Sequence, residues 1–197
     1  MLIVVMTQRR IGRRKGETAV SRPTETERVF DELLLTLART GDRRASRRLA
    51  ARWQPRLMRT ARRILRDDEL AREAVQESWT AICGGWLRLR DPAKFPAWAF
   101  GILHRKCADQ LRAAVKARER ETDLDAATNA ATKPRAETLT AIDQAFDDLS
   151  AEHRAAATLF FVEGLSVAEI AAAVGAPAGT VKSRVFYARQ QLRAALT

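Results

Sequence analysis

The sequence has few of the residues that build disulfide frameworks or metal centres. Its 197 residues include only two cysteines and two histidines. Cys83 and Cys107 are too few and too far apart for a disulfide framework, which fits a reducing cytoplasm. His104 and Cys107 supply two ligands on one expected helix, whereas a tetrahedral metal site needs three or four. Since Cys83 and His153 belong to other segments, we expect no bound metal.

Long apolar runs and alternating runs of β-branched residues are also missing. Residues 1–6 are apolar, but five Arg and Lys side chains follow between positions 9 and 15, so we predict neither a signal peptide nor a membrane span. Aromatic residues make up only 6% of the chain, whereas Ala, Leu and Arg are abundant, and this composition favours helix throughout. The sequence therefore predicts an all-α fold.

Acidic residues are outnumbered, because 35 Lys and Arg stand against 24 Asp and Glu and give a formal charge of +11. Such a balance attracts polyanions over long range, so nucleic acid is the first partner to consider. The sequence offers no acid–base pair, nucleophile motif or phosphate-binding loop. We therefore expect a protein that is not an enzyme, with no catalytic residue, no cofactor and no small-molecule substrate.

Periodicity divides the chain into four parts. Residues 1–24 are charged and lack periodicity, which is typical of a disordered basic tail. Helical patterns run through residues 25–118, whereas residues 119–138 have almost no large apolar side chain and are expected to form a flexible linker. Periodicity returns over residues 139–197. The pattern predicts two small helical domains joined by that linker.

The last segment, LSVAEIAAAVGAPAGTVKSRVFYARQQLRAAL, has the signals of a helix-turn-helix. Ser166 and Glu169 have the spacing of a capping box, which predicts a helix that begins at this point. Gly175 suits the left-handed backbone that ends a helix, and Pro177 suits the start of the next one. In a helix-turn-helix the second helix lies in the major groove.

The second helix of this motif has one apolar face and one exposed face. The inward positions recur at helical spacing and are Val181, Val185, Ala188 and Leu192. The expected DNA-contacting residues are polar, basic or aromatic, and they are Thr180, Lys182, Ser183, Arg184, Phe186, Tyr187 and Arg189. Arg and Lys reach base acceptors and phosphates in the major groove, and an apolar group can meet a thymine methyl. An exposed aromatic pair beside cations favours this interpretation over a merely solvated face.

Residues 66–82, RDDELAREAVQESWTAI, predict a helix with an acidic face. The acids at its start favour a helix N-terminus, and Glu73, Gln76 and Glu77 fall on or near one polar side. These acids could simply balance nearby Arg62, Arg63 and Arg72. On so basic a protein, however, an acidic patch indicates a partner other than DNA.

The segment FPAWAFGILHRKCADQLRAAVKARER interleaves aromatic and basic residues. This combination suits stacking on unpaired bases and binding of the phosphate chain. With Lys94 just before the segment, the candidate residues for contacting nucleic acid are Lys94, Phe95, Trp98, Phe100, Arg105, Lys106 and Arg112. The spacing also allows Trp98 and Phe100 a place in the core.

In these segments and their order, the sequence resembles the extracytoplasmic-function branch of the sigma-70 family over residues 29–196. DDELAREAVQESW resembles the family's helix that docks on the β′ clamp helices of RNA polymerase, with Glu73, Gln76 and Glu77 on its Gln-Glu motif. FPAWAFGILHRKCADQLR resembles the segment that melts and reads the −10 element, and the helix-turn-helix resembles the reader of the −35 element. No segment resembles the family's region three, which implies the minimal two-domain branch.

The resemblance implies a sigma factor that directs promoter-specific initiation by core RNA polymerase. Its partners would be the β′ clamp helices and β flap of the polymerase, promoter DNA and an anti-sigma factor. A flipped −10 base would enter a pocket at the loop of Arg90, Asp91, Lys94 and Phe95, at the cost of unstacking.

The chain also departs from the family's usual pattern. Gly101, Leu103 and Cys107 are unusual, and the Pro177–Gly179 turn lacks the common branched residue. These departures bear on the promoter sequence rather than on the family.

Two other functions remain to be separated from this one. A helix-turn-helix repressor or response-regulator output domain would bind duplex DNA as a dimer without polymerase, but it would not need the acidic helix or the aromatic-basic segment. A protein-interaction module that sequesters a regulator would have lost its DNA contacts, whereas Lys182, Arg184 and Arg189 are present.

Overall fold

The computed structural model describes residues 23–122 and 141–195, and every regular element in these residues is helical, as predicted. The expected tail falls outside the described residues except for its last two positions. Most of the expected linker also falls outside them. Its first residues, 119–122, are helical and belong to the helix before them, which is a correction to the predicted boundary at 118.

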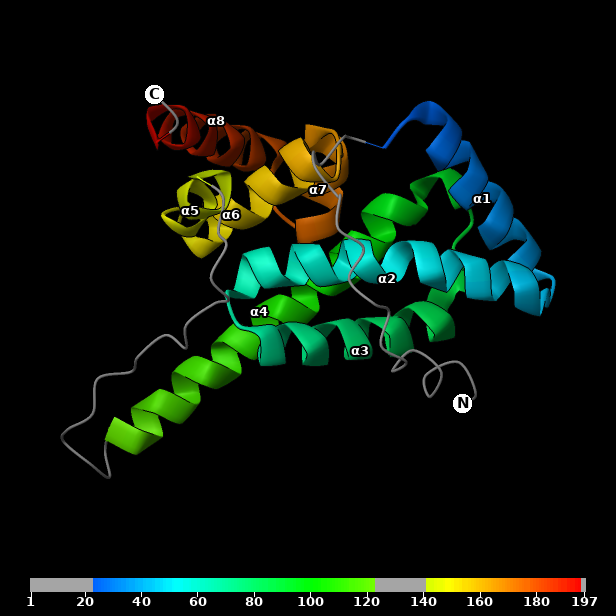
Figure 1. Cartoon of the computed structure of the whole chain (residues 1–197), viewed down its shortest axis with the longest axis horizontal. Helices are drawn as coiled ribbons and strands as arrows, with labels where there is room; N and C mark the ends of the chain where they lie inside the picture. The colour runs from blue at the N-terminus through cyan, green and yellow to red at the C-terminus, as the bar shows by residue number, and fades with distance from the viewer. Residues whose placement is uncertain (1–22, 123–140, 196–197) are drawn as a thin grey trace.

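The N-terminal region (residues 23–122) has four long helices, shown from blue to green in Figure 1. They are α1 Glu25–Arg39, α2 Arg43–Leu65, α3 Asp68–Gly85 and α4 Phe95–Thr122. Two short 3₁₀ turns, Trp86–Arg88 and Pro92–Lys94, connect α3 to α4. The first three helices begin at side-chain caps, because Thr24, Asp42 and Asp67 each accept a hydrogen bond from a backbone N–H of the first turn.

The core of this region is built around an aromatic group. Trp53 of α2 is fully buried and its ring meets the edge of Phe95 at a centroid distance of 4.7 Å and Phe100 at 5.4 Å. The indole N–H of Trp53 donates to the buried carboxylate of Asp31 on α1, at 3.1 Å. Because the polar end of Trp53 has this partner, the ring can be buried without an unsatisfied donor.

The C-terminal region (residues 141–195) has shorter helices. They are α5 Ala141–Asp147, α6 Ala151–Ala157, a π-helical turn Thr158–Val162, α7 Val167–Val174 and α8 Ala178–Ala195. Ser166 and Glu169 form the predicted capping box, and Gly175 has the predicted left-handed backbone with φ 67°. The helix-turn-helix is therefore formed by α7 and α8.

The two regions also pack against each other, which the sequence did not indicate. In Figure 1 the C-terminal region lies on the far side of α2 from α3. Leu159, Leu165 and Ile170 belong to the same buried cluster as Trp53. The buried carboxylate of Glu163 accepts hydrogen bonds from Arg56 and Thr60 of α2.

Candidate DNA-binding and polymerase-binding surfaces

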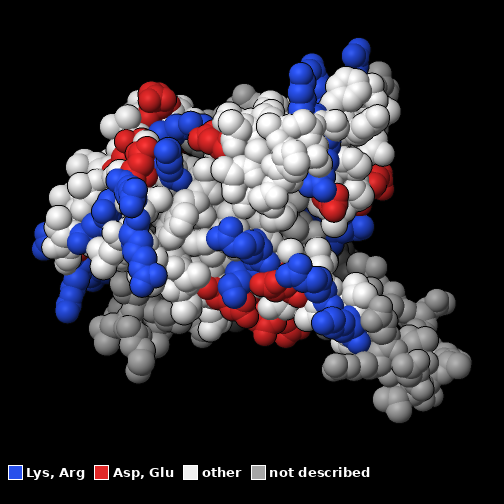
Figure 2. Space-filling model, turned by 180° about the vertical axis from the view of Figure 1, so that it is seen from behind, with Lys and Arg blue, Asp and Glu red and all other residues white. Residues whose placement is uncertain are grey.

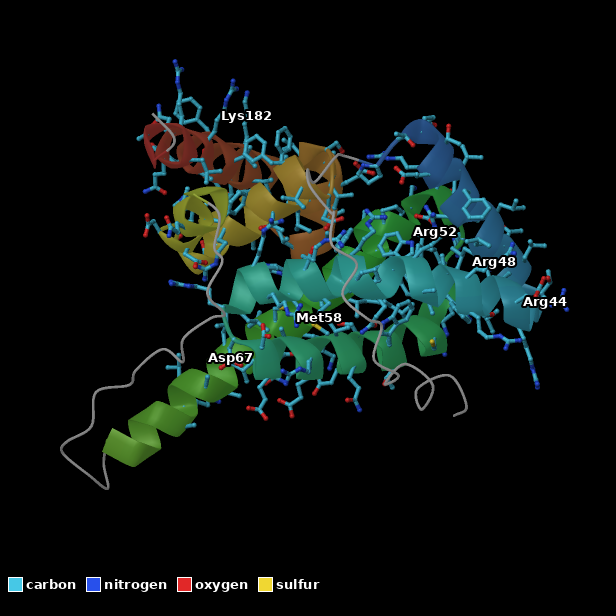
Figure 3. All side chains as sticks on the ribbon, in the orientation of Figure 1. Arg44, Arg48, Arg52, Met58, Asp67 and Lys182 are labelled. Carbon is cyan, nitrogen blue, oxygen red and sulfur yellow. The ribbon has the colours of Figure 1, made fainter. Side chains whose placement is uncertain are left out.

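Helix α8 presents the face that the sequence predicted. Val181, Val185 and Ala188 are buried, and Leu192 packs against the core. On the opposite side, Phe186 and Tyr187 are 55% and 56% exposed, with ring centroids 5.7 Å apart. The other outward side chains of the predicted set that are exposed are Thr180, Lys182, Ser183 and Arg189. Figure 3 shows Lys182 on the outer side of α8.

Two members of this set already have partners within the protein. Arg184 is only half exposed and forms an ion pair with Glu152 of α6. The Ser183 hydroxyl donates to the carbonyl oxygen of Gly179 at 3.1 Å, one turn earlier in the helix. Arg184 therefore braces α8 against α6, whereas Lys182 and Arg189 extend into solvent with no ion pair among the described residues.

The acidic face of α3 is exposed on the other side of the molecule. Glu73 and Gln76 are exposed, whereas Glu77 is half exposed and its carboxylate lies 3.0 Å from the Nζ atom of Lys106 on α4. Figure 2 shows acidic side chains gathered at the lower edge with basic ones above them. The sequence predicted Glu77 on a polymerase-binding surface and Lys106 on a DNA-binding surface. In the structure these two surfaces adjoin, because Glu77 and Lys106 form an ion pair.

The aromatic residues expected to contact the −10 element divide into buried and accessible ones. Phe95 and Phe100 are 1% and 0% exposed, and both contact Trp53 in the core. They therefore offer DNA no surface in this structure, which for Phe100 agrees with the alternative of a core position and for Phe95 departs from the expected DNA contact. Trp98 is half buried and packs near Phe95 and against Gly85, so part of this residue remains accessible.

The basic members of that set lie along α4 and just before it. Arg105 and Lys94 are exposed, and Arg112 is exposed while paired with Asp109. Lys94 also lies 3.8 Å from Asp91, whose carboxylate accepts from the N–H of Ala93 and so begins the turn before α4. With Arg90 also exposed, the loop expected to receive a flipped base presents its charged side chains to solvent, while Phe95 points into the core.

His104 and Cys107 have the surroundings of core residues. Burial raises the pKa of the Cys107 thiol to about 12, which keeps it protonated and unreactive at neutral pH. Burial also lowers the pKa of His104, as do the nearby positive charges of Arg184 and Arg105. Among the described residues, no three His, Cys, Asp or Glu side chains are grouped to hold a metal ion.

Charged residues that connect the two regions were missed by sequence reasoning. Arg56 and Glu163 are 107 positions apart in the chain, yet the Arg56 Nη2 atom lies 3.0 Å from Glu163 Oε2. The buried guanidinium of Arg154 donates to the carbonyl oxygen of Ile64 at the end of α2, at 3.1 Å. No local pattern marks an isolated charge as buried, so nothing in the sequence could have identified these residues.

Comparisons with known proteins agree with this architecture. A family model described as sigma-70 region 2 matches residues 49–117, and one described as sigma-70, region 4 matches residues 139–192. The chain is 34% identical over 162 residues to the ECF RNA polymerase sigma factor SigM of Mycobacterium tuberculosis strain H37Rv, covering 82% of each chain.

Two solved structures have the same fold. One is the sigma factor RpoE in complex with the anti-sigma factor NepR from Bartonella quintana, with a TM-score of 0.60, 26% identity and coverage of 76% of this chain and 95% of that one. The other is CnrH in complex with the cytosolic domain of CnrY, with a TM-score of 0.59, 26% identity and coverage of 85% and 97%.

The chain belongs to the sigma-70 family, as a sigma factor of the extracytoplasmic-function type. Proteins of this class are DNA-binding regulators of transcription initiation, so the prediction of a promoter-recognising sigma factor is confirmed. Within the described residues, no helix is both long and apolar enough to cross a membrane.

Proposed function

We propose that the two regions divide promoter recognition and polymerase binding among three surfaces. Glu73, Gln76 and Glu77 on α3 bind the β′ clamp helices of core polymerase. The −10 duplex is opened at the basic side of α4 by the accessible members of the predicted set, which are Lys94, Trp98, Arg105, Lys106 and Arg112. Phe95 and Phe100 support this surface from the core rather than contacting DNA, because both are buried.

The −35 element is read by α8, and one observation carries this assignment. Phe186 and Tyr187 are more than half exposed beside Lys182 and Arg189, which have no ion pair among the described residues. Burying two large aromatic rings against a partner is favourable, and Arg and Lys can contact base edges and phosphates at the same time. Thr180 and Ser183 supply the remaining polar contacts, and Arg184 acts through its pair with Glu152.

Under the proposed function the chain is not itself an enzyme, because the polymerase that it recruits catalyses RNA synthesis. One of the two similar solved structures is a sigma factor in complex with an anti-sigma factor. A partner of that kind would hold this chain inactive in the cytoplasm. The β flap is the expected polymerase contact of the C-terminal region.

The test separates the two partners by charge changes on opposite faces. Arg189→Ala is expected to weaken binding to promoter duplex about tenfold, which corresponds to about 1.4 kcal/mol, within the ~1–3 kcal/mol of one base contact, while leaving core-polymerase binding unchanged. Glu77→Lys is expected to weaken binding to core polymerase more than binding to promoter DNA. The measurement is fluorescence anisotropy with labelled promoter DNA and, separately, with core polymerase.

Promoters for this test come from sequencing the 5′ ends of transcripts made by core polymerase and the purified chain on host genomic fragments. Discrete starts preceded by two shared elements are the expected result. Equal loss of both affinities in Arg189→Ala would contradict the assignment of α8. Duplex binding without any polymerase-dependent transcript would instead support a repressor.

A further inference from the structure

A cluster of arginines surrounds the turn between α1 and α2. We call it the arginine corner, and its members are Arg39, Arg43, Arg44, Arg47 and Arg48. All are exposed except Arg39, which is half exposed. The segment that matches the sigma-70 region 2 model begins at residue 49, so the corner precedes the matched residues.

The corner concentrates like charges at the start of a helix. Arg43 and Arg44 occupy the first turn of α2, which contains no acidic residue, although the positive end of the helix dipole favours acids there. The cap, Asp42, uses its carboxylate oxygen to accept from the N–H groups of Arg44 and Ala45. Like charges one turn apart, as at Arg44 and Arg48, repel each other.

Among the described residues, none of these guanidinium groups forms an ion pair within 4 Å, and only the charge of Asp42 acts on Arg44 and Arg48 from a greater distance. Arg47 donates to the carbonyl oxygen of Arg43, and Arg39 donates to that of Leu87, but neither contact is an ion pair. The next arginine along the same row, Arg52, is by contrast bound to Asp31 at 2.7 Å. Figure 3 shows Arg44, Arg48 and Arg52 in succession along α2. Along this row, Arg52 is held in an ion pair, whereas Arg48 and Arg44, which lie nearer the corner, are exposed.

The corner is continuous with the loop before α4. Helix α1 packs against both 3₁₀ turns of that loop, and Arg39 reaches its backbone at Leu87. The loop adds exposed positive charge at Arg88, Arg90 and Lys94. Viewed from behind, basic side chains gather along one edge of the molecule (Figure 2).

We propose that the arginine corner holds the phosphate backbone of promoter DNA next to the −10 element, without reading its bases. This inference rests on the proposed function, because it extends the DNA surface of the N-terminal region. Exposed guanidinium groups without acidic partners suit phosphates, which they contact in a fork geometry. The five positive charges outnumber the single nearby acid, Asp42, so the corner keeps a positive excess that complements a polyanion. DNA is the polyanion already placed at the adjoining loop by the proposed function.

An acidic protein segment is the other occupant that this chemistry allows, since Phe30, Leu33 and Leu37 are exposed on neighbouring α1. DNA is favoured because the positive charge continues from the corner into the loop with Arg88 and Arg90, where Leu87 is the one large apolar side chain that the described residues expose. The experiment must therefore measure DNA and protein binding separately.

The test uses the full chain and a fluorescein-labelled mixed-sequence duplex with a single-stranded end, titrated across a range of KCl concentrations. Each phosphate contact removed lowers the slope of log K against log salt by roughly 0.9 for duplex and 0.7 for single strands. The double variant Arg44→Gln with Arg48→Gln is expected to lower the slope by about 1 to 2 and the affinity at least several-fold. The loss should be the same on unrelated sequences.

Arg59→Gln is the matched control for Arg48→Gln. Arg59 is exposed on the same helix, 11 residues and about three turns further on, so it lies on nearly the same side but about 16 Å from Arg48. It should leave the salt slope unchanged. Equal effects of the two single variants would overturn the inference, because they would show only a response to net charge.

Two other outcomes would also overturn it. One is an unchanged slope in the double variant, and the other is weaker binding to core polymerase with unchanged DNA binding, which would assign the corner to an acidic protein surface. Failure of the proposed function would look different, since the wild-type chain would then direct no polymerase-dependent transcripts, whatever the salt slope of its DNA binding.

Discussion

The N-terminal and C-terminal regions are stabilised in different ways. The N-terminal region has helices of 15 to 28 residues around Trp53, Phe95 and Phe100, which are essentially unexposed. In the C-terminal region, three of the four α-helices have only 7 or 8 residues, and its separate cluster is built on Phe146 and Leu149. Short helices gain little stability from propensity alone and depend on packing.

Much of the packing of the C-terminal region is provided by the other region. Its Leu159, Leu165 and Ile170 are buried in the cluster that contains Trp53 rather than in their own. The interface also contains buried polar groups, such as Glu163 with Arg56. The N-terminal region therefore has a core of its own, whereas the helix-turn-helix gains part of its stability by packing against the N-terminal region. Substitutions at the interface should therefore destabilise the C-terminal region more than the N-terminal region.

The largest expected effect comes from Glu163→Ala. Its two oxygens accept from Arg56 and from Thr60, the latter at 2.8 Å. Breaking a buried pair costs about 3–5 kcal/mol, and we expect the lower end because Arg56 keeps Asp31 at 3.5 Å. Urea unfolding measures the loss, and a double-mutant cycle with Arg56→Ala isolates the pair.

Glu169→Ala is the control for this prediction. It removes the capping box of α7 without touching the N-terminal region, so its cost should be nearer ~1 kcal/mol. If Glu163→Ala costs no more than an exposed substitution, roughly 0.5 kcal/mol, the ion pair does not hold the regions together.

A smaller effect is expected from Gly101→Ala, at the closest approach of α4 and α7. A Cβ atom at Gly101 would lie 2.9 Å from the carbonyl oxygen and 3.1 Å from the Cα of Ala173, and backbone atoms cannot move aside alone. The overpacking cost of roughly 1–3 kcal/mol should exceed the helix-propensity gain of up to about 1 kcal/mol. Small-angle scattering should show a larger radius of gyration as the regions separate.

Gly84→Ala provides the matched control within α3. A Cβ atom at Gly84 would meet no atom within 4 Å beyond its own stretch of helix, so the same substitution should be neutral or stabilising by roughly 0.5–1 kcal/mol. An equally compact and stable Gly101→Ala variant would show that the regions are not held at this contact.

The sequence predicted the local features of this molecule well and its long-range contacts poorly. The capping box at Ser166, the left-handed Gly175 and the exposed Phe186 follow from short-range rules of backbone geometry and helical spacing. The burial of Phe95 and Phe100 depends on the partner Trp53, some forty residues earlier, which periodicity does not identify. Gly101 was recognised only as unusual, because its close neighbour Ala173 is brought there by the docking of the regions.

The smallest expected effect is a pH dependence carried by His104, which faces the C-terminal region. Burial lowers the pKa of His104 from its ordinary 6.5, and the charges of Arg184 and Arg105 act in the same direction, whereas Glu152 opposes them. The unfolded chain therefore binds this proton at a higher pH than the folded protein. As the pH falls below about 6.5 toward the folded pKa, the free energy of unfolding should decrease.

His104→Gln removes this contribution, so the free energy of unfolding of the variant should fall less than that of the wild type between neutral and mildly acidic pH. Urea titrations at a series of pH values measure the difference. Glu152→Gln sharpens the test, because it removes the one nearby charge that favours protonation and should make the acid loss steeper. If the free energy of unfolding changed with pH in the same way in the wild type and in His104→Gln, His104 would be solvated in the folded protein. The contact between the two regions would then be looser than the buried Glu163 and the close approach of Gly101 to Ala173 indicate.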